Sequence, residues 1–220
     1  MTVRVGMAGW VFPDWRGTFY PVGLPQKNEL AYAATRVTSI EINSTFRSVP
    51  SLKSWLTWRD ATPDEFVFSV KAPHYITQVR KLRNVEEPLE RFFGSGILEL
   101  GQKLGPVMWQ LPEGLLWDAA LVEGFIAQLP AGIRYAMEAR DASFDNPDYL
   151  GLLARYGVAS VNGPAAGFRY LRVPGGSLDD AGLDALAATL DDGIDAYVYF
   201  VNGEKQFTPL NALALLERLS

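Results

Sequence analysis

The order of predicted elements constrains the fold of this chain more than any other feature. Segments rich in β-branched and aromatic residues alternate with amphipathic segments of helical length. The predicted strands are Val3–Ala8, Ser39–Asn43, Phe66–Lys71, Val107–Leu111, Arg134–Arg140, Val158–Val161, Arg169–Val173 and Ala196–Asn202. The predicted helices are Glu29–Arg36, Leu52–Asp60, Pro88–Lys103, Ala119–Leu129, Pro147–Tyr156, Leu178–Leu190 and Pro209–Leu219. Strands that alternate with helices pair in parallel, and this number of strands predicts a (β/α)8 barrel of the TIM type.

One connection departs from this pattern. Residues 162–168 alone join the sixth and seventh strands, and they are too few for a crossover helix. Either the connection is degenerate or the sheet is open at that point. No linker, repeat or low-complexity segment divides the 220 residues, so we expect a single domain over residues 1–220.

Short local motifs indicate where several helices begin and end. Asn146-Pro147 and Thr208-Pro209 each combine an N-cap residue with proline at the first helical position. Gly105 and Gly157 lie just past the ends of predicted helices, where glycine C-caps are common.

Composition excludes several classes of function. The net charge of −5 and the pI of about 5.0 argue against a nucleic-acid partner. The chain has no cysteine and one histidine, which excludes disulfides, thiolate nucleophiles and clustered cysteine or histidine metal sites. No apolar run is long enough to span a membrane and no signal-like N-terminus is present, so we expect a cytoplasmic protein without a membrane partner.

Alternation along the strands predicts which side chains point into the barrel. In the third strand, Phe66, Phe68 and Val70 share one apolar face, which suits packing against helices. Lys71 therefore belongs to the inward face. The same reasoning places polar inward residues at or near the carboxyl ends of six strands, namely Glu41, Asn43, Lys71, Gln110, Glu138, Arg140, Arg172 and Asn202. Barrel enzymes keep their active sites at this end.

The chemistry of this set favours a small anionic or polyhydroxylated ligand. Glu41 and Glu138 are candidate general acids or bases, and Lys71 is a candidate electrostatic or proton-transfer group. Arg140 and Arg172 can hold an anionic group through their planar guanidinium groups. Asn43, Gln110 and Asn202 are the candidate neutral contacts to the ligand. A hydrolase, lyase or isomerase would fit, and two carboxylates would also suit glycoside hydrolysis.

Four alternatives remain open. Lys71 is a candidate for Schiff-base formation with a carbonyl substrate. Glu41, Glu138 and Asn43 offer the oxygen ligands that Mg²⁺ or Mn²⁺ prefer, although three nearby cations would compete with a metal ion. The charged residues could instead pair with one another, Lys71 with Glu41 for example, and only close the barrel top. The protein could also bind its ligand without catalysis.

The loop after the first strand is unusually aromatic. GWVFPDWRGTFYP, residues 9–21, should leave the first strand at the rim that carries the polar residues. One interpretation is a lid in which Trp10, Phe12 and Trp15 contact the ligand and exclude water. The other is a miniature core that plugs the barrel top.

Several motifs together resemble the YecE-like family, also called domain of unknown function 72. They are GWVFPDWRGTFYP, SIEINSTF, TPDEFVFSVKAP, LGPVMWQLP and MEARDASF, and the resemblance extends from Val3 to about Leu219. The family implies a TIM-barrel-like fold, but no established activity. The matching positions in this chain include most of the inward polar residues named above.

The chain departs from the family pattern at several places. Gln78 stands where the family usually has histidine, and Arg172 is followed by Val173-Pro174 instead of the usual His-Gly. Arg47, Phe144 and Val201 stand where tyrosine, tryptophan and an acidic residue are common. If the family's chemistry needs the two histidines, the resemblance implies a divergent member that is inactive or catalytically altered.

Overall fold

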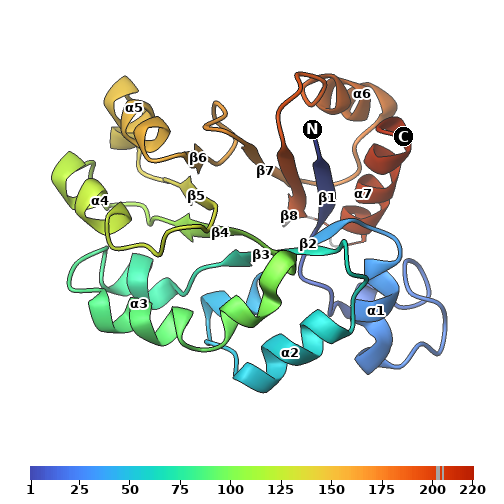
Figure 1. Cartoon of the computed structure of the whole chain (residues 1–220). Coiled ribbons are helices and arrows are strands. Elements are labelled where there is room, and N and C mark those ends of the chain that lie inside the picture. Colours follow the sequence, from blue (N-terminus) through green and yellow to red (C-terminus); the bar gives the residue numbers. More distant parts are fainter. Residues whose placement is uncertain (202–203, 205) are drawn as a thin grey trace.

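The chain forms one sheet of eight parallel strands in the order β6-β5-β4-β3-β2-β1-β8-β7 (Figure 1). The computed structural model describes residues 1–201, 204 and 206–220. The strands are β1 (Val3–Ala8), β2 (Ser39–Ile42), β3 (Val67–Lys71), β4 (Leu104–Gln110), β5 (Tyr135–Glu138), β6 (Val158–Ser160), β7 (Arg169–Pro174) and β8 (Ala196–Val201). The helices are α1 (Glu29–Ala34), α2 (Leu52–Asp60), α3 (Glu86–Phe93), α4 (Ala119–Ile126), α5 (Pro147–Arg155), α6 (Asp180–Ala188) and α7 (Phe207–Arg218). The TIM-barrel-like fold expected from the sequence is confirmed.

The barrel closes incompletely between β6 and β7. Val161 and Tyr170 form one isolated parallel bridge, and the Asn162 amide donates a hydrogen bond to the Tyr170 carbonyl at 3.0 Å. The Asn162 side chain then pairs with the backbone of Arg172, accepting from its amide at 2.8 Å and donating to its carbonyl at 3.0 Å. One side chain thus replaces two hydrogen bonds of a strand ladder. The helical layer has a matching gap between α5 and α6 (Figure 1).

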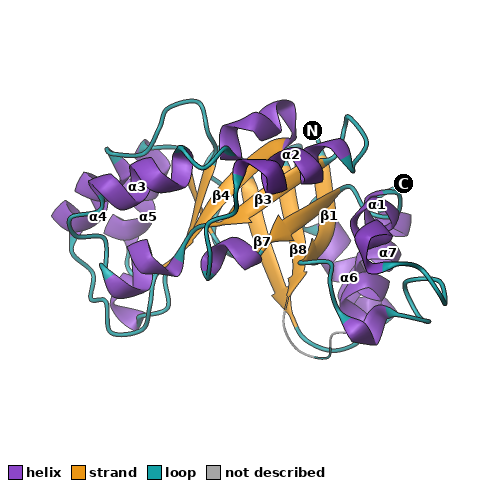
Figure 2. Ribbon diagram, turned by 90° about the horizontal axis from the view of Figure 1, so that it is seen from below, coloured by secondary structure: helices purple, strands orange, loops and turns teal. Residues whose placement is uncertain are grey.

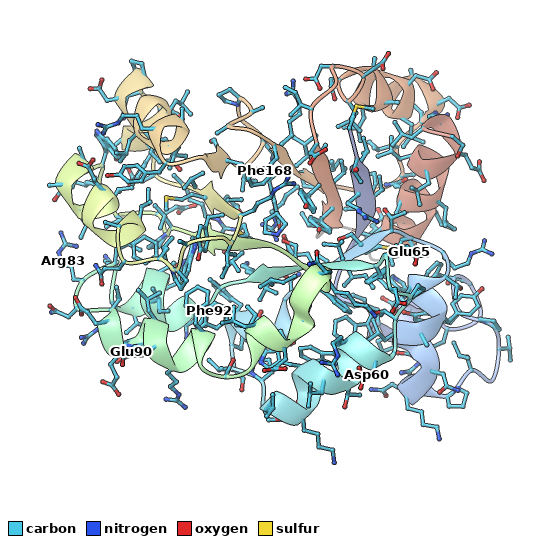
Figure 3. All side chains as sticks on the ribbon, viewed as in Figure 1. Asp60, Glu65, Arg83, Glu90, Phe92 and Phe168 are labelled. Carbon is cyan, nitrogen blue, oxygen red and sulfur yellow. The ribbon has the colours of Figure 1, made fainter. Side chains whose placement is uncertain are left out.

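Each face of the sheet has its own core. Outward side chains such as Met7, Ile40 and Phe68 pack beneath the helices, which lie outside the strands (Figure 2). The interior cluster contains Ala8, Val67, Met108, Ala136, Ala159, Phe168, Tyr170, Tyr197, Tyr199 and Val201. Alanines on β1, β5 and β6 complement the large rings at β7 and β8, so small and bulky side chains together fill the interior. Phe168 lies towards the ring of strands, whereas Arg83 and Glu90 lie at the periphery (Figure 3).

The helix-end predictions have mixed outcomes. The Asn146 side chain accepts a hydrogen bond from the Tyr149 amide as the N-cap of α5, and Gly157 follows that helix with φ of +64°. Both predictions are confirmed. Thr208 is not an N-cap, because α7 already begins at Phe207. Gly105 is not a C-cap but the second residue of β4.

The predicted helix Pro88–Lys103 is also wrong as a single element. It divides into α3 and a 3-10 segment, Ile97–Lys103. Gly96 stands between them with φ of +107°, a conformation that a continuing α-helix cannot contain.

Candidate functional site

Arg172 joins two carboxylates at the carboxyl end of the barrel. Its Nε and Nη2 donate to the two oxygens of Glu41, both at 3.1 Å. Its Nη1 donates to Oε2 of Glu138 at 2.6 Å. Each guanidinium nitrogen is therefore already bonded, and the side chain is 6% exposed. The structure thus places Arg172 in a network with both carboxylates, and its predicted contact with a ligand stays a prediction.

Hydroxyl groups extend this network down into the barrel. The Tyr170 hydroxyl donates to Oε2 of Glu41 at 2.7 Å and lies 2.7 Å from Oγ of Ser69. Ser69 in turn donates to the carbonyl of Pro106 at 2.6 Å. Glu41 has no exposed surface, so we interpret it as a residue that positions Arg172 and not as one that reaches a ligand. Sequence reasoning missed Tyr170, although its place two residues before Arg172 puts it on the same inward face.

Glu138 is the more accessible carboxylate, with 21% of its side chain exposed. Its Oε2 also accepts a hydrogen bond from Nε2 of Gln110 at 2.9 Å, and its Oε1 lies 3.4 Å from Nε of Arg140. Burial alone would raise the pKa of Glu138, but the charge of Arg172, the Gln110 bond and Arg140 together hold it below the usual value. Glu138 is therefore ionised at neutral pH.

Lys71 has no partner carboxylate within the described part of the chain. Its Nζ lies 4.0 Å from the ring centroid of Phe46, and the residue is 9% exposed. The sequence allowed a pair between Lys71 and Glu41, but Glu41 pairs with Arg172 instead. Burial, helped by the charge of Arg172, lowers the pKa of Lys71 to about 8, although Glu41 and Glu138 partly oppose this effect.

The remaining predicted polar residues differ in their burial and in their hydrogen bonds. Gln110 is buried against Glu138, and its carbonyl accepts a hydrogen bond from Gln78 at 2.6 Å. Arg140 keeps 45% of its side chain exposed. Oδ1 of Asn43 is buried without a hydrogen-bond partner among the described residues. Asn202 lies outside the described residues.

The aromatic loop divides into two parts. Trp15 has no exposed surface and packs against Phe12, Phe19 and Tyr20, with ring centroids 4.6, 5.6 and 5.9 Å away. This burial favours the miniature core over the lid for Trp15, because a ring without exposed surface cannot contact a ligand. Trp10 remains half-buried against an aromatic ring of α2.

The two glutamates do not present an open metal site. The guanidinium group of Arg172 bonds to both carboxylates, so a cation that used both would have to displace it. The described residues contain no group of three or more acidic or histidine side chains placed to hold a metal ion.

Among the helices of the described residues, none has the length and apolar character needed to cross a membrane.

The sequence matches a family model described as protein of unknown function DUF72 over residues 4–220. It is 26% identical over 149 residues to the UPF0759 protein YecE of Escherichia coli K12. That alignment covers 64% of this chain and 50% of YecE, so the chain spans about half the length of this curated relative.

Solved structures of two bacterial proteins share the fold. The DUF72 family protein TM1631 of Thermotoga maritima has a TM-score of 0.85 and 23% identity, with 100% of this chain and 99% of that chain covered. The DUF72 family protein EF0366 of Enterococcus faecalis has a TM-score of 0.78 and 15% identity, with 99% and 97% covered. At these identities, the likeness supports the architecture alone.

Proposed function

Because this chain belongs to the DUF72 family, whose description supplies no reaction, we propose a function from the site itself. The carboxyl end of the barrel binds a small anionic or polyhydroxylated molecule. Lys71 moves a proton to or from that molecule, and the ionised Glu138 at the same end of the barrel acts as the second acid–base group. Glu41 and Arg172 form the support that keeps Glu138 in place.

The proposal rests mainly on the burial of the Lys71 ammonium group and on its lowered pKa. A nearly buried ammonium group without a carboxylate partner in the described chain is costly, and an anionic group of the ligand would relieve that cost. A lysine with a pKa of about 8 also exchanges protons readily near neutral pH, as a general acid or base must. Arg140, which is partly exposed, supplies a further polar contact for the same molecule.

Hydrogen–deuterium exchange on small molecules tests the proposal without knowledge of the full reaction. The protein is incubated in D₂O with a panel of sugar phosphates, sugar acids and hydroxy ketones, and exchange at carbon is followed by NMR. Wild type should exchange protons of at least one compound, and Lys71→Met should lower that rate by about a hundredfold or more. Lys53→Met, which removes an exposed lysine of α2, is the matched control. Equal rates in wild type and Lys71→Met would exclude Lys71 as the proton-transfer group.

A Schiff base on Lys71 is a second candidate, favoured by the lack of an ion pair with any described residue and by the neighbouring charge of Arg172. The neutral amine would add to a carbonyl carbon, and loss of water from the carbinolamine would leave an imine. Borohydride would reduce the imine to a stable secondary amine on Lys71. Mass spectrometry after trapping with the same hydroxy ketones would show this adduct, whereas proton transfer alone would leave Lys71 unmodified.

A further inference from the structure

We propose that a second cavity, beside the barrel mouth, binds a small ring-bearing molecule through its phosphate or carboxylate group. The cavity has a volume of about 700 Å³, within the range of small-molecule sites. It lies between the loops that follow β2 and β3 and the start of α3. The side chains that matter for binding are Phe46, Arg47, His74, Tyr75, Arg80 and Arg91. Lys71, Glu41, Glu138 and Arg172 do not line it, so this inference does not depend on the proposed chemistry of Lys71.

Unneutralised positive charge is the first argument for an anion. Arg47, Arg80 and Arg91 form no ion pair within the described residues. Glu86 and Glu87 also line the cavity, so three arginines against two glutamates leave a net charge of +1 with neutral histidine. Guanidinium groups hold phosphate and carboxylate oxygens through paired hydrogen bonds, so arginines without an ion pair among the described residues indicate an acidic group on the ligand.

The backbone that forms one wall is held in a costly conformation. Residues Tyr75–Val79 form a π-helical turn, a feature often found at functional sites. Lys81, Leu82 and Asn84 follow with φ values of +48°, +65° and +50°. A left-handed conformation is unfavourable for leucine, because its Cβ atom then comes too close to the following carbonyl oxygen. The Asn84 carbonyl accepts from both Nε and Nη2 of Arg80, at 3.2 and 2.8 Å, which ties this guanidinium group to the same segment.

Aromatic side chains supply the surface for the rest of the molecule. Phe46 and His74 lie with their ring centroids 5.5 Å apart, and Nδ1 of His74 donates to the Phe46 carbonyl at 2.6 Å. That bond fixes the imidazole against the wall of the cavity. Tyr75 is 47% exposed at the same cavity, where its ring can stack on a ligand. Rings next to arginines suit an aryl phosphate or an aryl carboxylate.

Titration calorimetry with phenyl phosphate and benzoate tests the inference on the full chain at low salt. Wild type should bind both probes, with phenyl phosphate tighter because it carries more charge. Arg47→Gln and Arg91→Gln should each weaken binding about tenfold, the loss expected for one charge-assisted contact. Both arginines are exposed and donate no side-chain hydrogen bond to the described residues, so these variants should fold normally. The matched control is Arg36→Gln, which removes an equal charge from an exposed position just after α1. Its affinity for both probes should stay within about twofold of the wild-type value.

Three outcomes would overturn the inference. The first is no saturable binding of either probe by wild type below about 10 mM. The second is affinity that is unchanged by Arg47→Gln and Arg91→Gln but lost in Lys71→Met. That result would place the anion in the barrel mouth, which would support the proposed function while rejecting this cavity. Binding of phenol with the affinity of phenyl phosphate would also contradict a site built for an acidic group.

Discussion

At the scale of single residues, Arg172 determines how the charges at the barrel mouth are shared. Its guanidinium group bonds to Glu41, which has no exposed surface, and to the partly exposed Glu138. The Glu41 carboxylate has the Tyr170 hydroxyl as its other partner. Loss of Arg172 would leave a buried negative charge with one neutral hydrogen bond, a state that costs far more than the loss of an exposed ion pair.

We therefore predict that Arg172→Met lowers the free energy of unfolding by about 3–5 kcal/mol. Arg140→Met is the matched control, because Arg140 contacts the same Glu138 from an exposed position and should lower it by about 1 kcal/mol or less. Urea unfolding at pH 7 measures both. If Arg172→Met lowered the free energy of unfolding no more than Arg140→Met does, the bonds of Arg172 to Glu41 and Glu138 would contribute little to stability.

Lys71 gives a prediction about pH. Its pKa is about 8 in the folded protein, against 10.5 for an ordinary lysine. Between these values the unfolded chain holds a proton that the folded chain has released, so stability rises with pH and the cost of burying the charge disappears. Below pH 8 that cost is fully present. Lys71→Met removes the cost of burying this charge, so it should stabilise the protein more at pH 7 than at pH 10. We expect the free energy of unfolding to rise by about 1–2 kcal/mol more at pH 7, because water at the barrel mouth screens part of the charge.

Urea unfolding of wild type and Lys71→Met at pH 7, 9 and 10 checks this sign. Lys53→Met should show a difference from wild type that does not change with pH, because Lys53 is exposed. A stabilisation by Lys71→Met that grew from pH 7 to pH 10 would contradict a lowered pKa for Lys71.

At the scale of elements, the junction of β6 and β7 relies on one side chain. Asn162 has φ of +59°, which asparagine tolerates better than most residues, and its amide group makes both side-chain bonds to Arg172. These bonds also fix the strand that carries Arg172, so the junction connects barrel closure with the charge network.

Asn162→Ala should lower the free energy of unfolding by about 2–3 kcal/mol, because it removes two hydrogen bonds and strains the backbone. Asn162→Gly keeps the backbone unstrained and should lose about 1–2 kcal/mol from the hydrogen bonds alone. Urea unfolding, with hydrogen exchange at β6 and β7, separates the two contributions. Equal stability of wild type and Asn162→Ala would show that the junction does not need this side chain.

Sequence reasoning at this scale succeeded where signals are local. Alternating apolar residues located the strands, and the Asn146-Pro147 pair located the start of α5. It failed at Thr208, because α7 begins one residue earlier, and at Gly105. Gly105 lies in β4, where a Cβ atom would come within 2.6 Å of the Val67 side chain. A close approach between strands therefore requires glycine there, and the chain alone does not reveal that contact.

At the scale of the whole molecule, closure of the barrel depends on close contact between β1 and β2. Gly6 is paired with Ser39, and a Cβ atom at Gly6 would lie 1.7 Å from the Ser39 carbonyl oxygen. This oxygen belongs to the backbone, so it cannot rotate out of the way as a side-chain atom could. Any residue other than glycine must push the two strands apart.

Gly6→Ala should therefore destabilise the protein by about 3 kcal/mol or more. Gly124→Ala is the opposite case, because a Cβ atom at this position of α4 has no neighbour within 4 Å. It should stabilise the protein by about 0.5–1 kcal/mol through helix propensity. Thermal unfolding distinguishes the two directions, and a Gly6→Ala protein as stable as wild type would contradict the strand spacing.

The sequence by itself determined the barrel, the inward face of several strands and the end of the barrel where polar residues gather. These properties follow from a two-residue period and from the order of elements, both of which are local. Tertiary structure decided that Arg172 pairs with Glu41 and Glu138, that Lys71 has no carboxylate partner among the described residues, and that Trp15 is core. It also brought Arg47, Arg80 and Arg91 to one cavity. Partner choice depends on distances between elements far apart in the chain, and alternation along one strand does not carry that information.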